Sequence, residues 1–589
     1  MISKFTTLIE VLRHRASVTP QTVLYSFIED GNERKSEFTY SQLDERARAI
    51  ASYLQTKINK NDRALLLYQP GLDYIEAFMG CLYAGVIPVP AYPPDGRNLK
   101  RLLHVINDAN AAIALSTEAI YNNVSFLSEN GASDQIRKES SEFVQNIQWH
   151  LSDTIATAEA DKWNDADITK EDVAFLQYTS GSTNNPKGVI VTHHNLMTNF
   201  DFSEKAFEMS PERQMVSWLP PYHDMGLIGG ILQPLYSGMR TTLISPVSFI
   251  KKPLKWLSVI SECGKNGKII SGAPNFAYEL CVNKISDDQI NDLDLSNWTL
   301  AFNGAEPIRA ATLEAFAEKF KTTGFKKEHF FPVYGLAEAT LLVSAGNVPE
   351  LPIVKKVNKI LLEENTVTEK VENESDFIEK VGCGVELKGQ KLRIVDPATK
   401  IECEENTVGE IWISGPNVAK GYWENPEETE MTFNCTIENE EDSSYFRTGD
   451  LGYLNENQLY VTGRLKDLII IRGKNHYPQD IEFTVQNSHE ALRKDYGAAF
   501  SLDLNGEEQL VIIQEVKREF KRKIDIKEIS NIIRSAVSKE HQLVPAHIIL
   551  IEPSTFPKTS SGKLQRRASK DQFLKNELKE LETETAYSL

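Results

Sequence analysis

The most informative stretch of the chain is Tyr178-Thr-Ser-Gly-Ser-Thr-Asn-Asn-Pro-Lys-Gly-Val189, which follows the strand-like run 172–177 (DVAFLQ). Its hydroxyl groups and glycine N–H groups are dense enough to surround a phosphate, and Lys187 adds a positive charge. It is not a Walker A loop, because G-x-x-x-x-G-K-[ST] cannot be read from any glycine here. The stretch therefore predicts a phosphate-binding loop that begins where a strand ends.

On both sides of this loop, short apolar runs alternate with helix-period stretches. The runs 63–68, 240–246 and 267–274 have the length and the Gly, Pro or Asn flanks of buried strands. The stretches 40–55 and 309–324 repeat apolar residues at helical spacing. This alternation predicts an α/β fold with parallel sheets that are covered on both faces.

The composition is that of a large acidic globular protein. At about 150 residues per domain, 589 residues allow about four units. Apolar residues make up 41% and charged residues 25%, a balance that excludes disorder, collagen-like repetition and a disulfide scaffold. The 64 Lys and Arg against 83 Asp and Glu give a net charge of −19, which argues against a broad nucleic-acid or anionic-membrane surface.

Nothing in the sequence points to secretion or to a membrane span. Residues 1–20 carry Glu10 and three basic residues where a signal peptide needs an apolar core, and 18 apolar residues never run together. The six cysteines lie far apart, with no C-x-x-C pair, which favours buried free thiols. We therefore expect a cytoplasmic protein with no membrane span and no nucleic-acid partner.

The composition changes at two places along the chain. Residues 350–380 are dense in charge and contain no glycine, which predicts an exposed insertion. After about residue 465 the pattern changes to smaller units that predict a compact α+β domain. We therefore expect an N-terminal domain, 1–465, with an inserted surface segment at about 350–380, and a C-terminal domain, 466–589.

The loop at 178–189 resembles the phosphate loop of the adenylate-forming superfamily, which comprises acyl-CoA synthetases, peptide-synthetase adenylation domains and luciferases. Six further segments resemble that superfamily's motifs, in its order and across nearly the whole chain, so the set is specific although each member is weak. They are the substrate gate 218–227 (WLPPYHDMGL), the adenine loop 303–307 (NGAEP), the adenine-stacking and magnesium motif 334–340 (YGLAEAT), the ribose motif 447–452 (RTGDLG), the hinge 463–467 (GRLKD) and the lysine loop 557–563 (PKTSSGK).

The resemblance implies which residues bind ATP. The phosphate loop would hold the leaving pyrophosphate, Tyr334 would offer its ring to adenine, and Gly304 would leave room for the purine. Asp450 would accept the ribose hydroxyls. The implied ATP-binding residues are Thr179, Ser180, Gly181, Ser182, Thr183, Lys187, Gly304, Ala305, Glu306, Tyr334, Gly335, Asp450, Arg464 and Lys563.

The resemblance also implies three catalytic groups. Activation of a carboxylate on the ATP α-phosphate brings two anions together, so catalysis depends on positioning and charge neutralisation. Lys563 would bridge the carboxylate and the α-phosphate, and Arg464 would be a second ribose or phosphate contact. Glu338 would hold Mg²⁺, which takes few protein ligands and keeps oxygens from phosphate and water.

The remaining implied roles concern the substrate and the hinge. His223, Met225 and Gly226 would line the acyl-carboxylate end of the pocket, and the C-terminal domain would swing about Lys466. His223 and Asp224 are not expected to form a pair, because adjacent residues on a strand point to opposite faces.

Within the superfamily, three features resemble fatty acyl-AMP ligases. They are the run 91–94 (AYPP), the run 477–482 (YPQDIE) and the 350–380 insertion. In that group the insertion contacts the C-terminal domain and restricts the rotation that CoA ligases use. Lys474 stands where that group commonly has Arg.

This resemblance implies an α/β fold in which a large N-terminal domain holds two stacked mixed sheets with helices plus a distorted β-barrel, and a small α+β C-terminal domain lies on a hinge. It implies ATP and Mg²⁺ as cofactors, activation of a fatty acid to an acyl adenylate, and transfer to the phosphopantetheine thiol of an acyl carrier protein. An acyl-CoA synthetase and a non-catalytic nucleotide or acyl sensor remain alternatives. One basic run is either a carrier-docking surface or a solvated helix face: Lys517, Arg518, Lys521, Arg522, Lys523 and Lys527.

Overall fold

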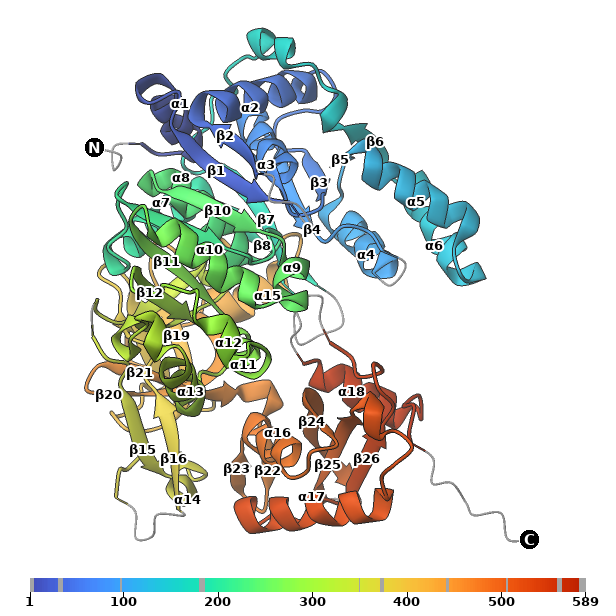
Figure 1. Ribbon diagram of the computed structural model, residues 1–589, viewed down its shortest axis with the longest axis vertical. Helices are drawn as coiled ribbons and strands as arrows, with labels where there is room; N and C mark the ends of the chain where they lie inside the picture. Colours follow the sequence, from blue (N-terminus) through green and yellow to red (C-terminus); the bar gives the residue numbers. More distant parts are fainter. Residues whose placement is uncertain are drawn as a thin grey trace.

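The computed structural model describes residues 5–29, 35–95, 98–179, 186–348, 350–370, 376–440, 444–504, 507–558 and 564–581. Figure 1 shows the N-terminal elements, in blue and green, in the upper part of the molecule and a C-terminal unit, in orange and red, below them. A yellow hairpin, β15–β16, reaches down beside that unit.

A nine-stranded sheet forms the centre of the N-terminal part. Its six inner strands, in the order β13-β12-β11-β9-β10-β1, are parallel, and antiparallel strands complete both edges. The predicted strand runs 240–246 and 267–274 are β10 and β11 of this sheet. The nine strands are β17 (Val385–Glu386), β14 (Leu342–Ala345), β13 (Phe330–Gly335), β12 (Trp298–Asn303), β11 (Lys268–Ala273), β9 (Arg213–Ser217), β10 (Arg240–Ile244), β1 (Val23–Ile28) and β2 (Lys35–Thr39).

A second, four-stranded parallel sheet lies N-terminal to it in sequence, and β7 contacts its edge strand β4. Its strands β4 (Ile87–Ala91), β3 (Arg63–Leu67), β5 (Ile113–Ser116) and β6 (Gln148–Leu151) are accompanied by the hairpin β7 (Val173–Thr179) and β8 (Lys187–Thr192). In β3, Ala64 and Leu66 face one core cluster whereas Leu65 and Leu67 face another. This alternation buries both faces of the sheet, as predicted for parallel strands.

Helices fill the space between the two sheets and cover their outer faces. The largest core cluster joins α1, α2, α3, α7 and α8 to strands of both sheets, so these helices lie between the layers. Helices α4, α5 and α6 cover the far face of the four-stranded sheet, and α10, α11 and α13 that of the nine-stranded sheet. The predicted helix 40–55 is α2. The helices are α1 (Leu8–Val18), α2 (Tyr40–Gln55), α3 (Leu72–Ala84), α4 (Leu99–Ala109), α5 (Glu118–Asn130), α6 (Asp134–Gln145), α7 (His193–Ala206), α8 (Gln233–Ser237), α9 (Pro246–Lys251), α10 (Leu254–Gly264), α11 (Asn275–Lys284), α12 (Asp287–Ile290) and α13 (Ala310–Lys319).

A four-stranded antiparallel sheet takes the place of the predicted distorted barrel. Its order is β18 (Lys391–Val395), β19 (Gly409–Ser414), β20 (Phe446–Asn455) and β21 (Gln458–Arg464), with α15 (Pro426–Phe433) between β19 and β20. The Leu459 backbone bonds to Cys383 and Gly384, just before β17 of the large sheet. Among the described residues β18 and β21 do not pair, so the sheet is open rather than a closed barrel.

The C-terminal unit is α+β and has its own apolar clusters. A three-stranded sheet is flanked by helices, and the half-buried Arg566 forms ion pairs with Asp467 and Glu482 at 2.9 and 2.7 Å. Its elements are β22 (Ile469–Ile471), β23 (Lys474–His476), α16 (Pro478–Asn487), β24 (Leu492–Leu504), β25 (Glu507–Val516), α17 (Ile526–His541), β26 (His547–Ile551) and α18 (Arg566–Leu574).

The insertion is a hairpin with a short helix, and it is not simply an exposed loop. It comprises β15 (Val354–Asn358), α14 (Lys359–Leu362) and β16 (Phe377–Val381). Val357 and Leu362 are 1% and 2% exposed. The prediction of an exposed insertion is therefore wrong for these apolar positions, which pack against β20, β21 and Tyr477.

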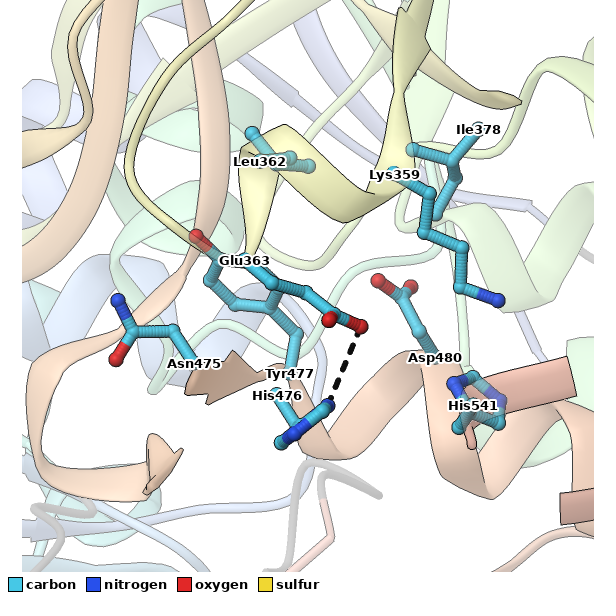
Figure 2. A pocket seen from close by; sticks show the side chains of 9 residues that line it. All are labelled: Lys359, Leu362, Glu363, Ile378, Asn475, His476, Tyr477, Asp480 and His541. Carbon is cyan, nitrogen blue, oxygen red and sulfur yellow. Dashed lines mark ion pairs between the residues drawn. The ribbon is translucent and has the colours of Figure 1, made fainter. Parts of the chain in front are cut away.

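The tip of the insertion contacts the C-terminal unit. The Asn475 N–H donates to the Glu363 carbonyl at 2.9 Å, and Lys359 forms an ion pair with Glu540 at 2.8 Å. Figure 2 shows the Glu363 carboxylate pointing toward the His476 imidazole, 3.3 Å away. A cavity of about 20 Å³, room for about one water molecule, lies within this interface.

All six cysteines are free thiols in the structure, and four of them are buried. Burial raises the pKa of Cys81 and Cys281, so both are protonated and unreactive at neutral pH. None of the described helices is long and apolar enough to cross a membrane.

Candidate active site

The phosphate-loop stretch connects the strands of the β7–β8 hairpin. Thr179 at the end of β7 is the register partner of Lys187 at the start of β8, so the two residues close the loop at its base. Lys187 forms an ion pair with Glu428 of α15, and its ammonium lies 4.9 Å from the centre of the Tyr422 ring. The predicted loop residues Ser180, Gly181, Ser182 and Thr183 lie outside the described residues.

The structure brings the predicted adenine and ribose residues together. Tyr334, in β13, donates a hydrogen bond from its hydroxyl to Asp450 Oδ2 at 2.7 Å. Arg464, opposite Asp450 in β21, donates from Nε to Oδ1 at 3.2 Å. Burial, with the Asp450 charge, raises the pKa of Tyr334 well above its usual value, so this phenol stays a donor. Both Asp450 oxygens are thus held in place.

Glu338 lies in a one-turn helix, Ala337–Ala339, that follows β13. The Tyr422 hydroxyl donates to its Oε1 at 3.0 Å, and the Ala419 N–H donates to its carbonyl at 2.8 Å. Burial raises the pKa of the Glu338 carboxyl, the hydrogen bond from Tyr422 opposes this, and the nearby Asp224 charge adds to it. Arg464 acts in the opposite direction, so Glu338 belongs to the same charged cluster as the ribose residues.

This arrangement fits Mg²⁺, whose preferred ligands are carboxylates together with phosphate and water oxygens. Glu338 and the neighbouring Asp224 supply carboxylates on one side of the cluster. Within the described ranges, no set of three or more His, Cys, Asp or Glu side chains could form a metal site on protein ligands alone. A magnesium ion here would depend on the nucleotide for most of its oxygens.

Residues 419–423 connect the phosphate loop to Glu338, and the sequence analysis missed them. Ile190 donates to the Gly421 carbonyl at 2.9 Å and Trp423 donates to the Gly188 carbonyl at 2.7 Å, so the segment runs along β8. Gly421 has φ +140°, and a Cβ there would lie 2.5 Å from Thr429. Tyr422 is thereby placed between Lys187 and Glu338. Its only sequence signal is an aromatic residue after glycine, which is too common to carry a prediction.

The expectation that His223 and Asp224 point apart is wrong. The two residues lie in a turn that leads into a π-helix, Met225–Leu232, and not on a strand. His223 Nδ1 lies 2.6 Å from Asp224 Oδ1, and the same carboxylate oxygen accepts the Met225 N–H at 2.6 Å. Asp224 is near enough to Glu338 for its charge to raise the pKa of that carboxyl, and contact of the pair with substrate stays a prediction.

Packing explains two predicted binding residues of the substrate gate. Met225 is 8% exposed and belongs to an apolar cluster with Trp218 and Phe249. A Cβ on Gly226 would lie 2.0 Å from the Pro220 carbonyl oxygen, so only glycine allows this turn to close. A contact of either residue with substrate stays a prediction.

The predicted adenine-loop residues follow β12. Ala305 adopts φ +68°, and a Cβ on Gly304 would lie 2.8 Å from Val333, so the loop packs closely on β13. Glu306 Oε1 accepts the Phe276 N–H at 2.5 Å. Gly335, another predicted ATP-binding residue, is the last residue of β13, and its contact with ATP stays a prediction.

The C-terminal unit meets this site through Lys558, at the start of the lysine loop. Its ammonium lies 3.8 Å from the centre of the Tyr496 ring, and Glu306 is among its electrostatic partners. The predicted hinge residue Lys466 is exposed in the single turn Leu465–Asp467 between β21 and β22. Lys563 lies outside the described residues, and its role stays a prediction.

The family model of AMP-binding enzymes matches residues 12–423 of this chain. The chain belongs to the AMP-binding enzyme family. A second model, described as the AMP domain of Disco-interacting protein 2-like proteins, matches residues 466–583. The adenylate-forming resemblance drawn from the motifs is thus confirmed for this AMP-binding enzyme, which uses ATP.

Named relatives match nearly the whole length of this AMP-binding enzyme. It is 42% identical over 585 residues to the medium-chain-fatty-acid–[acyl-carrier-protein] ligase JamA of Moorena producens, covering 98% of this chain and 97% of the relative. The corresponding ligase TtuA of Teredinibacter turnerae is 33% identical, covering 97% and 94%. A fatty acyl-adenylate ligase from L. pneumophila, solved in complex with acyl adenylate and pyrophosphate, is 40% identical with a TM-score of 0.75, covering 99% and 98%. The resemblance to fatty acyl-AMP ligases and the α/β fold are confirmed.

Proposed function

We propose that this enzyme activates a fatty acid with ATP and then transfers the acyl group to an acyl carrier protein. A carboxylate oxygen of the fatty acid forms a bond to the α-phosphorus while the bond to pyrophosphate breaks. The phosphopantetheine sulfur of the carrier next forms the thioester, AMP leaves, and the thiol proton passes to solvent. The names of JamA and TtuA support this reaction.

The single observation that carries the proposal is the charged cluster that β13 and the following turn form with β20 and β21. Asp450 is held by Tyr334 and Arg464 at 2.7 and 3.2 Å, and Glu338 lies within electrostatic reach of Arg464. In our proposal Asp450 accepts the ribose hydroxyls and Tyr334 faces adenine. Lys187 and the loop 179–183 hold the pyrophosphate, and Lys563 reaches the α-phosphate.

Magnesium is part of the proposal, held by Glu338 and by phosphate oxygens of ATP. When bound there, it neutralises charge on the phosphates. Asp450 and Tyr334, which are proposed to bind ribose and adenine, would position the nucleotide so that its phosphates reach the magnesium ion. His223 and Met225 are proposed to border the acyl carboxylate, and Lys466 to act as the hinge between 1–465 and 466–589. A cytoplasmic location is likewise proposed, from the six free thiols.

Pyrophosphate release with ATP, Mg²⁺ and a mixed set of fatty acids tests the first step. We expect release with at least one chain length, and mass spectrometry of the retained adenylate identifies that acid. No release with any fatty acid would contradict the proposal and would favour a nucleotide or acyl sensor.

An acyl-CoA synthetase is the second candidate, and it differs only in the thiol acceptor. The contacts of the insertion with Asn475 and Glu540 favour the carrier protein, because they tie down the unit that must rotate for transfer to CoA. Parallel assays with phosphopantetheinylated carrier and with CoA discriminate the two. Faster formation of acyl-CoA than of acyl carrier would establish the CoA ligase instead.

A further inference from the structure

A basic surface on the C-terminal unit stands out on this acidic protein. Residues 517–528 hold six cations and three acids, in a chain whose net charge is −19. Four of the cations are exposed and, within the described structure, have no carboxylate within ion-pair distance: Arg518, Arg522, Lys523 and Lys527. Lys521 pairs with Glu552 at 2.6 Å and is thereby fixed at the edge of the patch.

The basic surface borders an open hollow of about 410 Å³. Arg493, Lys517 and Arg518 line it together with one acid, Glu519, and Pro553 and Ser554 line it from the loop after β26. Arg493 forms an ion pair with the fully buried Glu515, and its guanidinium lies 3.5 Å from the centre of the Tyr496 ring. Arg493 therefore presents a fixed cation to the hollow.

The same Tyr496 ring links the hollow to the reaction side of the molecule. Lys558 lies 3.8 Å from its centre, and Lys558 in turn is influenced by the charge of Glu306 in the adenine loop. One aromatic side chain thus separates the hollow from the residue that begins the lysine loop. A partner seated on the hollow would lie close to Lys558, where the lysine loop begins.

We propose that this basic hollow, lined by Arg493, Lys517 and Arg518 and extended by Arg522 and Lys523, docks the acidic face of the acyl carrier protein. The inference rests on the proposed function and names the surface that the carrier uses. An acidic partner is repelled by most of this protein, so a local cationic patch concentrates its encounters at one place. The hollow accepts an acidic side chain that reaches Arg493.

Charge reversal at the half-buried Lys517 and at the exposed Arg518 and Arg522, as Lys517→Glu, Arg518→Glu and Arg522→Glu together, tests the proposal. The readouts are pyrophosphate release, acyl transfer to phosphopantetheinylated carrier protein, and acyl transfer to free phosphopantetheine. We expect kcat/KM for the carrier to fall by about tenfold or more at low salt. Adenylate formation and transfer to free phosphopantetheine should stay unchanged. Added salt should bring kcat/KM for the carrier closer together in the variant and the unmodified enzyme.

The matched control reverses two exposed cations elsewhere, Lys57→Glu at the end of α2 and Lys268→Glu at the start of β11. It should leave transfer to the carrier unchanged. Unchanged transfer in the triple variant, or an equal loss with both acceptors, would overturn the docking surface. Failure of the proposed function is a separate result, because the unmodified enzyme would then release no pyrophosphate.

Discussion

The phenol of Tyr422 donates a 3.0 Å hydrogen bond to the carboxylate of Glu338, and the two residues lie 84 positions apart in the chain. Tyr422 is 9% exposed and its main chain belongs to the segment that runs along β8. The proposed magnesium ligand is therefore positioned by the strand that leaves the phosphate loop. A change at Tyr422 should alter metal use without removing any group that touches ATP.

Replacement of Tyr422 by Phe should raise the Mg²⁺ concentration for half-maximal pyrophosphate release by about tenfold or more, as for other partners of metal ligands. The hydrogen bond stabilises the Glu338 carboxylate against protonation. Its loss should move the acid limb of the pH–rate profile to higher pH. Tyr460→Phe is the matched control, because the Tyr460 hydroxyl is buried and has no hydrogen-bond partner among the residues that the structure describes. Equal effects of both substitutions would contradict the positioning role.

Replacement of Asp450 by Asn should raise KM for ATP by tenfold to a hundredfold, roughly the effect of hydrogen bonds to a charged group. The side chain keeps its shape and an oxygen for the Tyr334 hydroxyl, so the fold should persist. Asp396→Asn, at a turn carboxylate that accepts backbone N–H groups outside the site, serves as the control. If KM stays the same while the melting temperature falls, Asp450 only holds Tyr334 and Arg464 in place.

Replacement of Gly226 by Ala should lower the free energy of unfolding by about 1–3 kcal/mol, the usual effect of overpacking. The added Cβ would have to displace the Pro220 carbonyl, 2.0 Å away. Thermal melts against Gly346→Ala, where the nearest atom would be 3.8 Å away, measure the difference. A normal melting temperature with a raised KM for the fatty acid would show instead that Gly226 contacts substrate.

The interface between the insertion and the C-terminal unit should weaken in acid. Burial, together with Lys359 and His476, lowers the pKa of His541 to about 4, while Asp480 and Glu540 act in the opposite direction. An unfolded histidine has a pKa of about 6.5, so the unfolded state binds the proton more readily and stability falls as the pH drops from about 6.5 toward 4.

His541→Gln should remove about 2 kcal/mol of this loss at pH 5. The melting temperature of the variant should therefore depend less on pH than that of the unmodified protein. His193, which is buried in the N-terminal part and has a pKa lowered to about 4, should still titrate in the variant. Parallel pH curves for the variant and the unmodified protein would show that His541 does not sense pH.

Lys359→Glu should raise the rate of acyl-CoA formation several-fold, because it replaces the ion pair with Glu540 by repulsion and releases the insertion. The Lys359 side chain is 14% exposed, so its pairing is shielded from salt more than an ordinary surface pair. The charge-swapped variant Lys359→Glu with Glu540→Lys should return the rate toward its original value. An unchanged rate of acyl-CoA formation would show that the contact of the insertion with Glu540 does not determine which thiol accepts the acyl group.

The sequence alone was enough to predict those site residues that each stand within one short motif. Tyr334, Asp450 and Glu338 stand in recognisable motifs, and the structure brings them together. Tyr422 could not be found in this way, because its role depends on hydrogen bonds between β8 and a segment more than 200 positions later in the chain. Hydrogen bonds between segments so far apart leave no periodic pattern in the local sequence, so such a pattern could not predict the position of Tyr422.

Besides the barrel, two predictions that the structure corrects have physical causes. The prediction places His223 and Asp224 on a strand, whereas they lie in a turn before the π-helix Met225–Leu232, where the Asp224 carboxylate contacts the His223 ring. The insertion was read as exposed from its charge. Its few apolar residues, Val357 and Leu362, become buried only against β20, β21 and Tyr477, which lie far along the chain.

The hairpin β15–β16 holds the C-terminal unit at β23 and α17, whereas the single turn that contains Lys466 joins that unit to the rest of the chain (Figure 1). If the C-terminal unit rotates about the proposed hinge at Lys466, its contacts with the insertion form a second attachment at a separate point. Even a small rotation must break these contacts, so the unit should move between discrete positions and not through a continuum. The choice of thiol acceptor could then evolve through the length of the hairpin and the strength of its contacts with the C-terminal unit, while the residues that perform adenylation stay unchanged.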